Sequence, residues 1–330
     1  MPQRTRLAVV MDPIEDIKYA KDTTLAMLLA AQARGHELWY LRQGDLYLRD
    51  GVARGHARPL AVEADPAAWF TLGEAVDTAL GDFDAILMRK DPPFDMEFVH
   101  TTYILERAEA AGALVVNRPQ GLRDMNEKVY TAWFPEYCAP TLVTRDMAAM
   151  GEFAREFGRV VVKPLDGMGG RSIFVIDRAD KNFGVVCETL TANGTRFAMM
   201  QKYLPEIVTG GDTRVLLIDG RPAPYALSRM PAAHDNRGNL AAGATGVARP
   251  LTEREQELAA GIGPKLAARG MLFVGLDVIG GFVTEINVTS PTGVREIDKA
   301  FGTNLADTFI EAVERHLAAP GRAAARQATV

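Results

Sequence analysis

Three oxygen-bearing side chains near the C-terminal end of the chain have spacings that suit a divalent cation. Asp277 lies in one apolar run, and Glu285 and Asn287 lie two residues apart in the next. Carboxylate and amide oxygens are hard ligands of the kind Mg²⁺ prefers, often shared with substrate phosphates. Residues two apart on a strand share a face, so Glu285 and Asn287 point the same way. The alternative is a solvated hairpin face that carries these acids by chance.

The turn between these two runs decides whether Asp277 can face Glu285. A two-residue turn at Gly280 and Gly281 pairs Asp277 with Thr284 and puts Glu285 on the wrong face. A three-residue turn or a β-bulge brings the two carboxylates opposite each other. The metal hypothesis therefore predicts a three-residue or bulged hairpin.

A lysine and a glycine-rich loop follow another apolar run. Lys163 ends the run 159–163 and precedes the loop 166–172. Lysine reaches phosphate oxygens as a point charge, and glycines let backbone N–H groups approach a phosphate. A strand follows the loop and Gly-Lys-Ser/Thr is missing, so this is not a P-loop. The alternative is a surface lysine beside a flexible turn. The loop glycines are Gly167, Gly169 and Gly170.

Other candidates rest on fewer residues. Lys128 follows Asn126 and Glu127, and the stretch 201–204 ends an expected strand between two lobes. An adenine could hydrogen-bond to that backbone, although an ordinary strand end is the alternative. Arginine binds carboxylate and phosphate in bidentate fashion, although each arginine can equally be a surface charge. The arginines considered are Arg214, Arg229 and Arg295.

The stretch 231–246 is rich in Ala, Gly and Asn and contains His234, Asp235 and Arg237. Its length without periodicity predicts a functional loop or lid, with a floppy insertion as the alternative. The sequence suggests no Ser/His/Asp or Cys/His set. The five histidines have no metal-site spacing.

Alternating strand and helix patterns in the first third predict a parallel, Rossmann-like sheet. No Gly-x-Gly-x-x-Gly follows the first strand, so a dinucleotide site is not expected. The expected strands are 7–11, 37–41, 85–88 and 113–116, with helices starting at Asp22 or Thr23 and ending by Gly35, and at 96–111.

The pattern changes near residue 124. Strands are expected at 159–163, 173–176, 196–204, 214–218, 225–230, 273–279 and 282–288, and helices at 182–192, 252–268 and 304–318. The stretch 320–330 is rich in Ala and Arg and is expected to be frayed.

Composition limits the class of protein. A chain of 330 residues with 48% hydrophobic and 24% charged residues predicts two or three packed units rather than disorder. A net charge of -5 gives no basic field for nucleic acid. No apolar segment is long enough to span a membrane or act as a signal peptide. Two cysteines, Cys138 and Cys187, fit a reducing compartment. We therefore expect a cytoplasmic globular protein without nucleic-acid or membrane partners.

Taken together, the motifs resemble those of the ATP-grasp superfamily, specifically the bacterial glutathione synthetases, from about Leu7 to about Leu317. The stretches that carry the resemblance are MDPI at 11–14, GDLY at 44–47, MRKDPPF at 88–94, YILERA at 103–108, NEK at 126–128, KPLDGMGG at 163–170, RGNLAAG at 237–243, FVGLD at 273–277 and TEINVTSPT at 284–292. Many long matches in one order make a chance resemblance implausible.

The resemblance implies an α/β ATP-grasp fold. Its expected parts are an N-terminal Rossmann-like domain over 1–124, a small α+β lid over 125–204, a C-terminal α+β ATP-binding domain over 205–318, and a disordered tail over 319–330. It also implies ligation of γ-L-glutamyl-L-cysteine and glycine to glutathione. ATP phosphorylates the cysteinyl carboxylate, glycine's amine attacks the acyl phosphate, and ADP and phosphate leave. Mg²⁺, with Mn²⁺ as the alternative ion, and a cytoplasmic homotetramer are further implications.

The resemblance also implies roles for individual residues. Asp277, Glu285 and Asn287 would bind the metal, and Lys128 and Lys163 would hold ATP phosphates beside the glycine loop. The implied adenine pocket is Gln201, Tyr203 and Leu204, with Asp212 near the ribose. Arg214, Arg229 and Arg295 would hold the substrate carboxylate or the transferring phosphoryl group. The implied substrate-binding residues are Arg237, Asn239 and Ser290.

The sequence departs from the family pattern in two places. Ala244 and Thr245 stand where the family commonly has Gly-Arg, which leaves a loop-borne arginine contact in doubt, and Gly293 replaces a cysteine of some relatives. Two alternatives remain open. One is another ATP-grasp ligase, such as a D-alanine–D-alanine or glutamate-adding enzyme. The other is a non-catalytic ATP-binding regulator, expected to lack part of the metal set or Arg295.

Overall fold

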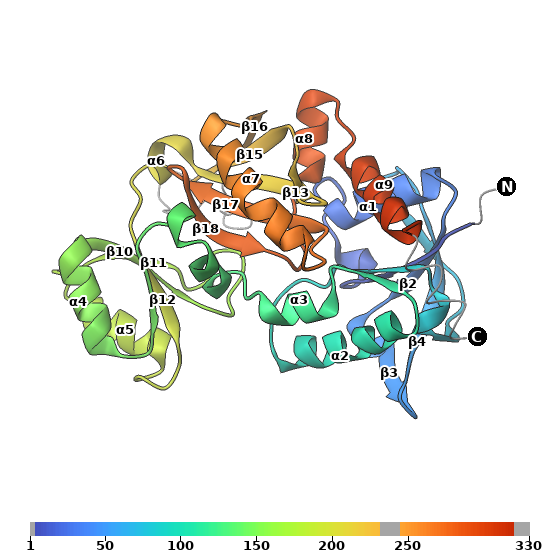
Figure 1. Ribbon diagram of the computed structural model, residues 1–330, viewed down its shortest axis with the longest axis horizontal. Coiled ribbons are helices and arrows are strands. Elements are labelled where there is room, and N and C mark those ends of the chain that lie inside the picture. Colours follow the sequence, from blue (N-terminus) through green and yellow to red (C-terminus); the bar gives the residue numbers. More distant parts are fainter. Residues whose placement is uncertain (1–3, 232–244, 320–330) are drawn as a thin grey trace.

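The computed structural model describes residues 4–231 and 245–319, which form three sheets (Figure 1). The sheets have eight, four and six strands and follow one another along the chain. Within those residues, no helix is both long and apolar enough to cross a membrane.

The N-terminal sheet is built around β1, which pairs in parallel with β2 and β7. Alternate residues of β1 are buried on opposite faces: Val9 packs in the cluster that contains Leu28 of α1, and Val10 in the cluster that contains Leu105 of α2. One helix therefore covers each face of this sheet, as expected for continuous apolar strands. The strands are β1 (Arg6–Val10), β2 (Glu37–Leu41), β3 (Leu46–Arg49), β4 (Val52–Val62), β5 (Phe70–Leu72), β6 (Val76–Ala79), β7 (Ala85–Met88) and β8 (Leu114–Val116), and the helices are α1 (Thr23–Ala33), α2 (Met96–Ala110) and α3 (Pro119–Asp124).

The four-stranded sheet belongs to a smaller lobe, seen at the left of Figure 1. Val162 of β10 and Met200 of β12 pack with Met150 of α4 and Leu190 of α5 in a separate apolar cluster. Because side chains alternate along a strand, the neighbouring residues of β10 and β12 face the opposite way. This lobe comprises β9 (Thr141–Thr144), α4 (Met147–Phe157), β10 (Arg159–Pro164), β11 (Phe174–Asp177), α5 (Phe183–Thr191) and β12 (Ala198–Lys202).

The six-stranded sheet lies between this lobe and the N-terminal sheet in Figure 1. Val215 of β13 packs with α7, whereas Leu216 packs with α8 and α9 on the other face. Helix α9 returns to α1, where Arg34 contacts Asp307 at 2.7 Å. The elements are α6 (Ile207–Gly210), β13 (Asp212–Ile218), β14 (Arg221–Pro222), β15 (Tyr225–Met230), β16 (Thr245–Pro250), α7 (Glu253–Ala267), β17 (Phe273–Ile279), β18 (Phe282–Asn287), α8 (Val294–Phe301) and α9 (Leu305–Leu317).

Most expected strands and helices are present, with ends shifted by a few residues. The expected strand 196–204 is shorter, because β12 covers only Ala198–Lys202. The expected loop 231–246 was wrong at its end, since Thr245 and Gly246 pair with β15 as the start of β16. Residues 232–244 and 320–330, for which a loop and a frayed tail were expected, lie outside the described residues. The elements that the sequence did not predict are β3, β4, β5, β6, β9, β14, β16, α3, α4, α6 and α8.

Candidate active site

Two adjoining cavities lie between the lobes. The larger has a volume of about 430 Å³ and the smaller about 80 Å³, and Glu285 and Ile173 line both. Among the predicted residues, the larger cavity is lined by Lys128, Gly167, Gly169, Gly170, Arg214, Arg229, Asp277, Glu285, Asn287 and Ser290. The smaller is lined by Lys163, Gln201, Tyr203, Leu204, Asp212 and Glu285.

The hairpin of β17 and β18 carries the bulge that the metal hypothesis predicted. Ile279 pairs with Phe282 across the Gly280-Gly281 turn, but the register then shifts and Asp277 pairs with Glu285. Thr284 is the extra residue, and its hydroxyl donates to the Asp277 carbonyl at 3.2 Å. The bulge therefore reverses the strand's alternation and brings both carboxylates to the cavity.

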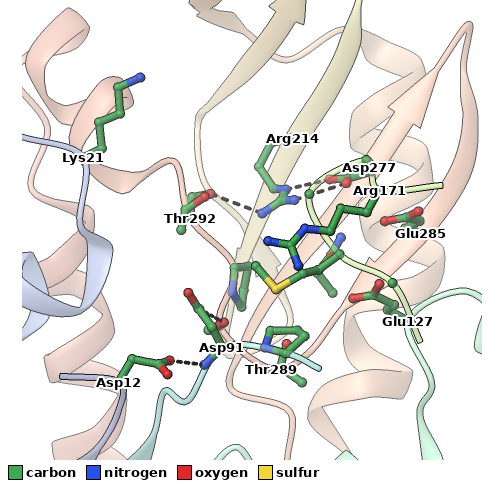
Figure 2. A pocket seen from close by; sticks show the side chains of 18 of the residues that line it. Asp12, Lys21, Asp91, Glu127, Arg171, Arg214, Asp277, Glu285, Thr289 and Thr292 are labelled. Carbon is green, nitrogen blue, oxygen red and sulfur yellow. Dashed lines mark hydrogen bonds and ion pairs between the residues drawn. The ribbon is translucent and has the colours of Figure 1, made fainter. Parts of the chain in front are cut away.

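Asp277 is held by two buried arginines. Arg214 Nε lies 2.6 Å from Asp277 Oδ1 (Figure 2). The second arginine, Arg229, lies 2.9 Å from Asp277 Oδ2. Burial raises the pKa of the Asp277 carboxyl, but the two guanidinium groups outweigh it and hold the pKa below its usual range. Arg229 also pairs with Asp212 at 2.7 Å, and burial raises the pKa of Asp212 to about 6.

Glu285 lies between the two predicted lysines. Lys163 Nζ lies 3.2 Å from Glu285 Oε1 and donates to the carbonyl of Thr284 at 3.3 Å. Lys128 Nζ lies 3.8 Å from the same carboxylate oxygen. Burial raises the pKa of Glu285, but the two lysines outweigh burial and lower it. Two lysines from different segments of the chain, Lys128 and Lys163, therefore contact the carboxylate of Glu285.

Glu127 is a site residue that the sequence analysis did not single out. Its carboxylate contacts Lys128 and lines the larger cavity, and both burial and the nearby Glu285 raise its pKa. Its backbone carbonyl accepts a hydrogen bond from Ile286 at 2.8 Å, which places it beside β18. Its position next to Lys128 in the NEK motif was the signal that could have identified it.

The glycine loop is tied to the 126–128 segment. Asn126 Nδ2 donates to the Leu165 carbonyl at 3.0 Å, and Lys128 Nζ donates to the Gly167 carbonyl at 2.7 Å. Arg171, also missed by the sequence analysis, lines the larger cavity from this loop, and Figure 2 shows it extending into the cavity. The loop therefore supplies both backbone and a cation to the site.

The smaller cavity is a mostly apolar slot. Val161 and Val175 of the lobe's sheet form its walls with Ile207 and Ile279 from the central sheet side. Asp212 lines it with an Oδ1 atom that is buried and accepts no hydrogen bond from the described residues. An apolar slot with a few polar groups suits a planar base and its sugar.

Not every predicted residue reaches these cavities. Arg295 is absent from the described lining of the larger cavity and instead donates to the Asp22 carbonyl at 3.0 Å. Ser290 does line it, where its hydroxyl donates to Asp91. Arg237 and Asn239 lie outside the described residues.

The predicted metal ligands fit a hard divalent cation in donor chemistry. Asp277, Glu285 and Asn287 all line one cavity, where Glu127 adds a fourth oxygen-bearing side chain. Each Asp277 oxygen already accepts from an arginine, but a carboxylate has about four lone-pair sites, so one contact does not exclude another. Glu127 and Glu285, which disfavour each other's charge, would gain from a cation between them.

Two family models match the chain in succession. Residues 5–123 match the model of the prokaryotic glutathione synthetase N-terminal domain, and residues 127–302 match the model of its ATP-grasp domain. Together these ranges include both cavities and all three sheets.

Relatives and solved structures agree with these matches. The chain is 57% identical over 314 residues to a glutathione synthetase from Pseudomonas syringae pv. tomato, which covers 95% of this chain and 98% of that one. It is 53% identical over 312 residues to the glutathione synthetase of Escherichia coli strain K12, with 94% and 98% covered. By fold it is similar to the D-cycloserine synthetase DcsG, with a TM-score of 0.66 at 17% sequence identity, over 94% of this chain and 99% of DcsG. It is also similar to the ATP-grasp ligase PsnB, with a TM-score of 0.62 at 19% sequence identity, over 95% of this chain and 99% of PsnB.

Proposed function

Because this chain belongs to the prokaryotic glutathione synthetase family, we propose that it joins γ-L-glutamyl-L-cysteine to glycine with ATP, as an ATP-dependent carbon–nitrogen ligase. The products are glutathione, ADP and phosphate. The observation that carries the proposal is the position of Lys163, Lys128 and Glu285 where the apolar slot adjoins the larger cavity. A base in the slot directs its phosphates past these lysines toward the larger cavity.

The slot binds the adenosine part of ATP. Val161 and Val175, which are paired on neighbouring strands, contact one face of the base, and Ile207 and Ile279 contact the other. The free Oδ1 of Asp212 accepts a hydrogen bond from a ribose hydroxyl. Gln201, Tyr203 and Leu204 border the base at the end of β12. The glycine loop covers the phosphates from the lobe side with its backbone N–H groups.

The phosphates meet charges that are already positioned. Lys128 and Lys163 approach them from two directions, and Arg214 and Arg229 stand deeper in the cavity on β13 and β15. Phosphoryl transfer gains mostly from positioning and charge neutralisation, so fixed cations are its main requirement. Asp277, Glu285 and Asn287 would hold Mg²⁺, which Mn²⁺ could replace, and such an ion neutralises phosphate charge when bound.

The chemistry proceeds in two displacements. The cysteinyl carboxylate of the dipeptide attacks the γ-phosphorus, a P–O bond to ADP breaks, and an acyl phosphate forms. The glycine amine then attacks the acyl carbon, loses a proton, and expels phosphate as the amide bond forms. Water would hydrolyse the acyl phosphate, so closure of the glycine loop over the cavity protects it.

The outer part of the larger cavity accepts the dipeptide. Asp12, Asp91, Lys21 and Ser290 line it. Figure 2 shows Asp12 close to Asp91 and Lys21 farther away. A dipeptide with one ammonium and two carboxylates is complementary to such mixed charge. Arg295, which contacts Asp22 at the start of α1, acts there by positioning this segment.

Assembly and location complete the proposal. The two cysteines of this chain are free thiols, which fits a reducing cytoplasm. By family resemblance we propose a homotetramer, whose mass in light scattering would be four times the 35.9 kDa of one chain.

The deciding experiment measures phosphate release with ATP, Mg²⁺ and γ-glutamylcysteine, with and without glycine, beside mass detection of glutathione. Glycine-dependent release matched one-for-one by glutathione is the expected result. Turnover only with another acid and amine pair would overturn the substrate assignment while keeping ATP-grasp chemistry. ATP binding without turnover of any pair would favour a regulator.

A further inference from the structure

The side-chain amide of Gln201 is bound by a hydroxyl on the neighbouring strand. Gln201 of β12 and Thr141 of β9 are paired positions of an antiparallel ladder, and Gln201 Nε2 donates to Thr141 Oγ1 at 3.1 Å. Gln201 is only 4% exposed and lines the smaller cavity. Thr141 is not among the described residues that line this cavity, so its hydroxyl acts on the cavity only through Gln201.

The Thr141 hydroxyl has a fixed polarity. It donates its one hydrogen to the Ala139 carbonyl at 2.8 Å. Toward Gln201 the oxygen can therefore only accept, and the amide must turn its NH₂ group to Thr141. The network thus fixes which end of the amide faces which way.

The carbonyl oxygen of Gln201 is left available as an acceptor. Among residues 4–231 and 245–319, no donor forms a hydrogen bond to Gln201 Oε1. The nearby walls of the slot, Val161, Ile173 and Val175, are apolar and offer no side-chain donor or acceptor in its place. A base in the slot therefore meets an oriented acceptor in apolar surroundings.

We propose that Thr141 is a positioning residue that sets the purine selectivity of the nucleotide site, by holding Gln201 Oε1 toward the base. An adenine offers an exocyclic amine at its 6-position, which donates to this acceptor. Hypoxanthine and guanine offer a 6-oxo group, which places two acceptors against each other. This inference rests on the proposed function only in that the smaller cavity binds the nucleotide base.

The expected size of the effect follows from burial. A buried polar group left facing an unsuitable partner lowers affinity by about tenfold to a hundredfold. Without the Thr141 hydroxyl the amide can turn over and offer Nε2 to a 6-oxo group. The preference for 6-amino purines then falls by about tenfold, because the same side chain serves either base.

The test compares ADP with IDP, which differ only in the base, by calorimetric binding to the full chain with Mg²⁺. Thr141→Val keeps the shape and strand preference but removes the hydroxyl, and Thr141→Ser keeps the hydroxyl. The expected result is a ratio of dissociation constants, IDP to ADP, that falls about tenfold in T141V and is retained in T141S. Equal weakening of both nucleotides in T141V, with the ratio unchanged, would overturn the proposal.

A double variant separates positioning from a general structural effect. In a Gln201→Leu background there is no amide to orient, so adding T141V should leave the IDP-to-ADP ratio unchanged. A further shift of the ratio in that background would show that Thr141 acts by another route. Because these measurements need no ligase turnover, they stand or fall separately from the glutathione assignment.

Discussion

At the scale of single residues, three of the cations that line the two cavities are paired with carboxylates of the protein. Lys128 contacts Glu127, Lys163 contacts Glu285, and Arg214 contacts Asp277. A buried charge left without its partner is costly, so removing either member of one of these pairs should destabilise the site.

Replacing Lys163 with methionine should remove one of the positioned phosphate contacts. We expect kcat/KM for ATP to fall by about 10²–10³, the usual effect of losing one charge-stabilising donor. Steady-state kinetics at varied ATP would measure this. Lys181→Met, at an exposed lysine of the same lobe, is the control and should keep the parental rate. A similar loss in both variants would count against a specific role for Lys163.

Replacing Glu255 with glutamine should give a pH-dependent loss of stability. Burial raises the pKa of Glu255, but its hydrogen bonds to Arg249, at 2.7 and 2.8 Å, and to the Thr252 backbone lower it below the usual 4.5. A carboxyl group whose pKa is lower in the folded state than in the unfolded state stabilises the fold at pH values above its unfolded-state pKa. This contribution is lost as the pH falls through the folded-state pKa. We expect E255Q to be less stable by roughly 1–3 kcal/mol near neutral pH.

Free energies of unfolding in urea, measured for the parental protein and E255Q in steps from about pH 7 to about pH 3.5, would show how the stability difference changes with pH. The difference between them should shrink below pH 4.5, the usual carboxyl value. A difference that stays constant down to the lowest pH would mean that the charge of Glu255 contributes nothing.

At the scale of elements, the 126–128 segment and the glycine loop act as one unit. Asn126 accepts from the backbone of Lys128 and Val129 and donates to the carbonyl of Leu165. The aspartate variant Asn126→Asp keeps the two accepted bonds and replaces the donated one with a repulsive contact between a carboxylate and the Leu165 carbonyl. It therefore breaks the link between the segment and the loop while preserving the bonds within the segment.

We expect N126D to raise the KM for ATP by roughly fivefold, as for one lost hydrogen bond, with little change in melting temperature. Trypsin should cleave faster after Arg171, which is exposed within the loop. Limited proteolysis followed by mass spectrometry would locate the cut. Unchanged cleavage with an unchanged KM would show that the loop does not depend on this contact.

The sequence predicted elements best where the apolar pattern is long and local. Strand β2 and helix α1, capped by Asp22, are as expected. The β17–β18 bulge was predicted because side chains alternate along a strand, so that Asp277 can pair with Glu285 only if the hairpin contains one extra residue. The antiparallel strands β3 to β6 were missed because their burial alternates with exposed polar residues. Glu127 and Thr141 were missed because their contacts are with residues distant in sequence, Ile286 and Gln201 respectively.

At the scale of the whole molecule, the smaller lobe has its own core, while the two larger sheets share theirs. Val162 and Met200 pack only within the lobe's cluster. Val10 of β1 and Val215 of β13, by contrast, belong to one cluster that joins the N-terminal and central sheets. A lobe with a separate core can move as a rigid body against the rest.

Truncating one core residue in the smaller lobe, and another in the core shared by the two larger sheets, should show whether these two parts unfold independently. Met200→Ala, at a site with 0% exposure, should cost about 2–5 kcal/mol and increase amide exchange across 141–202 while leaving β1 protected. Val9→Ala, also at 0% exposure in the shared part, is the matched comparison and should raise exchange in the N-terminal and central sheets together. Hydrogen-exchange mass spectrometry measures both. Uniform deprotection of the chain by M200A would rule out a separately stable lobe.

The internal pairing of Lys163 with Glu285 crosses from the lobe's β10 to the central sheet's β18. In the proposed reaction, a phosphate that binds Lys163 displaces Glu285 as its anionic partner, and Lys163 pairs with Glu285 again when the product leaves. Phosphate binding and release then exchange one anionic partner of the buried Lys163 for another, so the lysine is never buried without an anion. Turnover requires product release, and the return of Lys163 to Glu285 would offset part of the free energy lost when ADP dissociates.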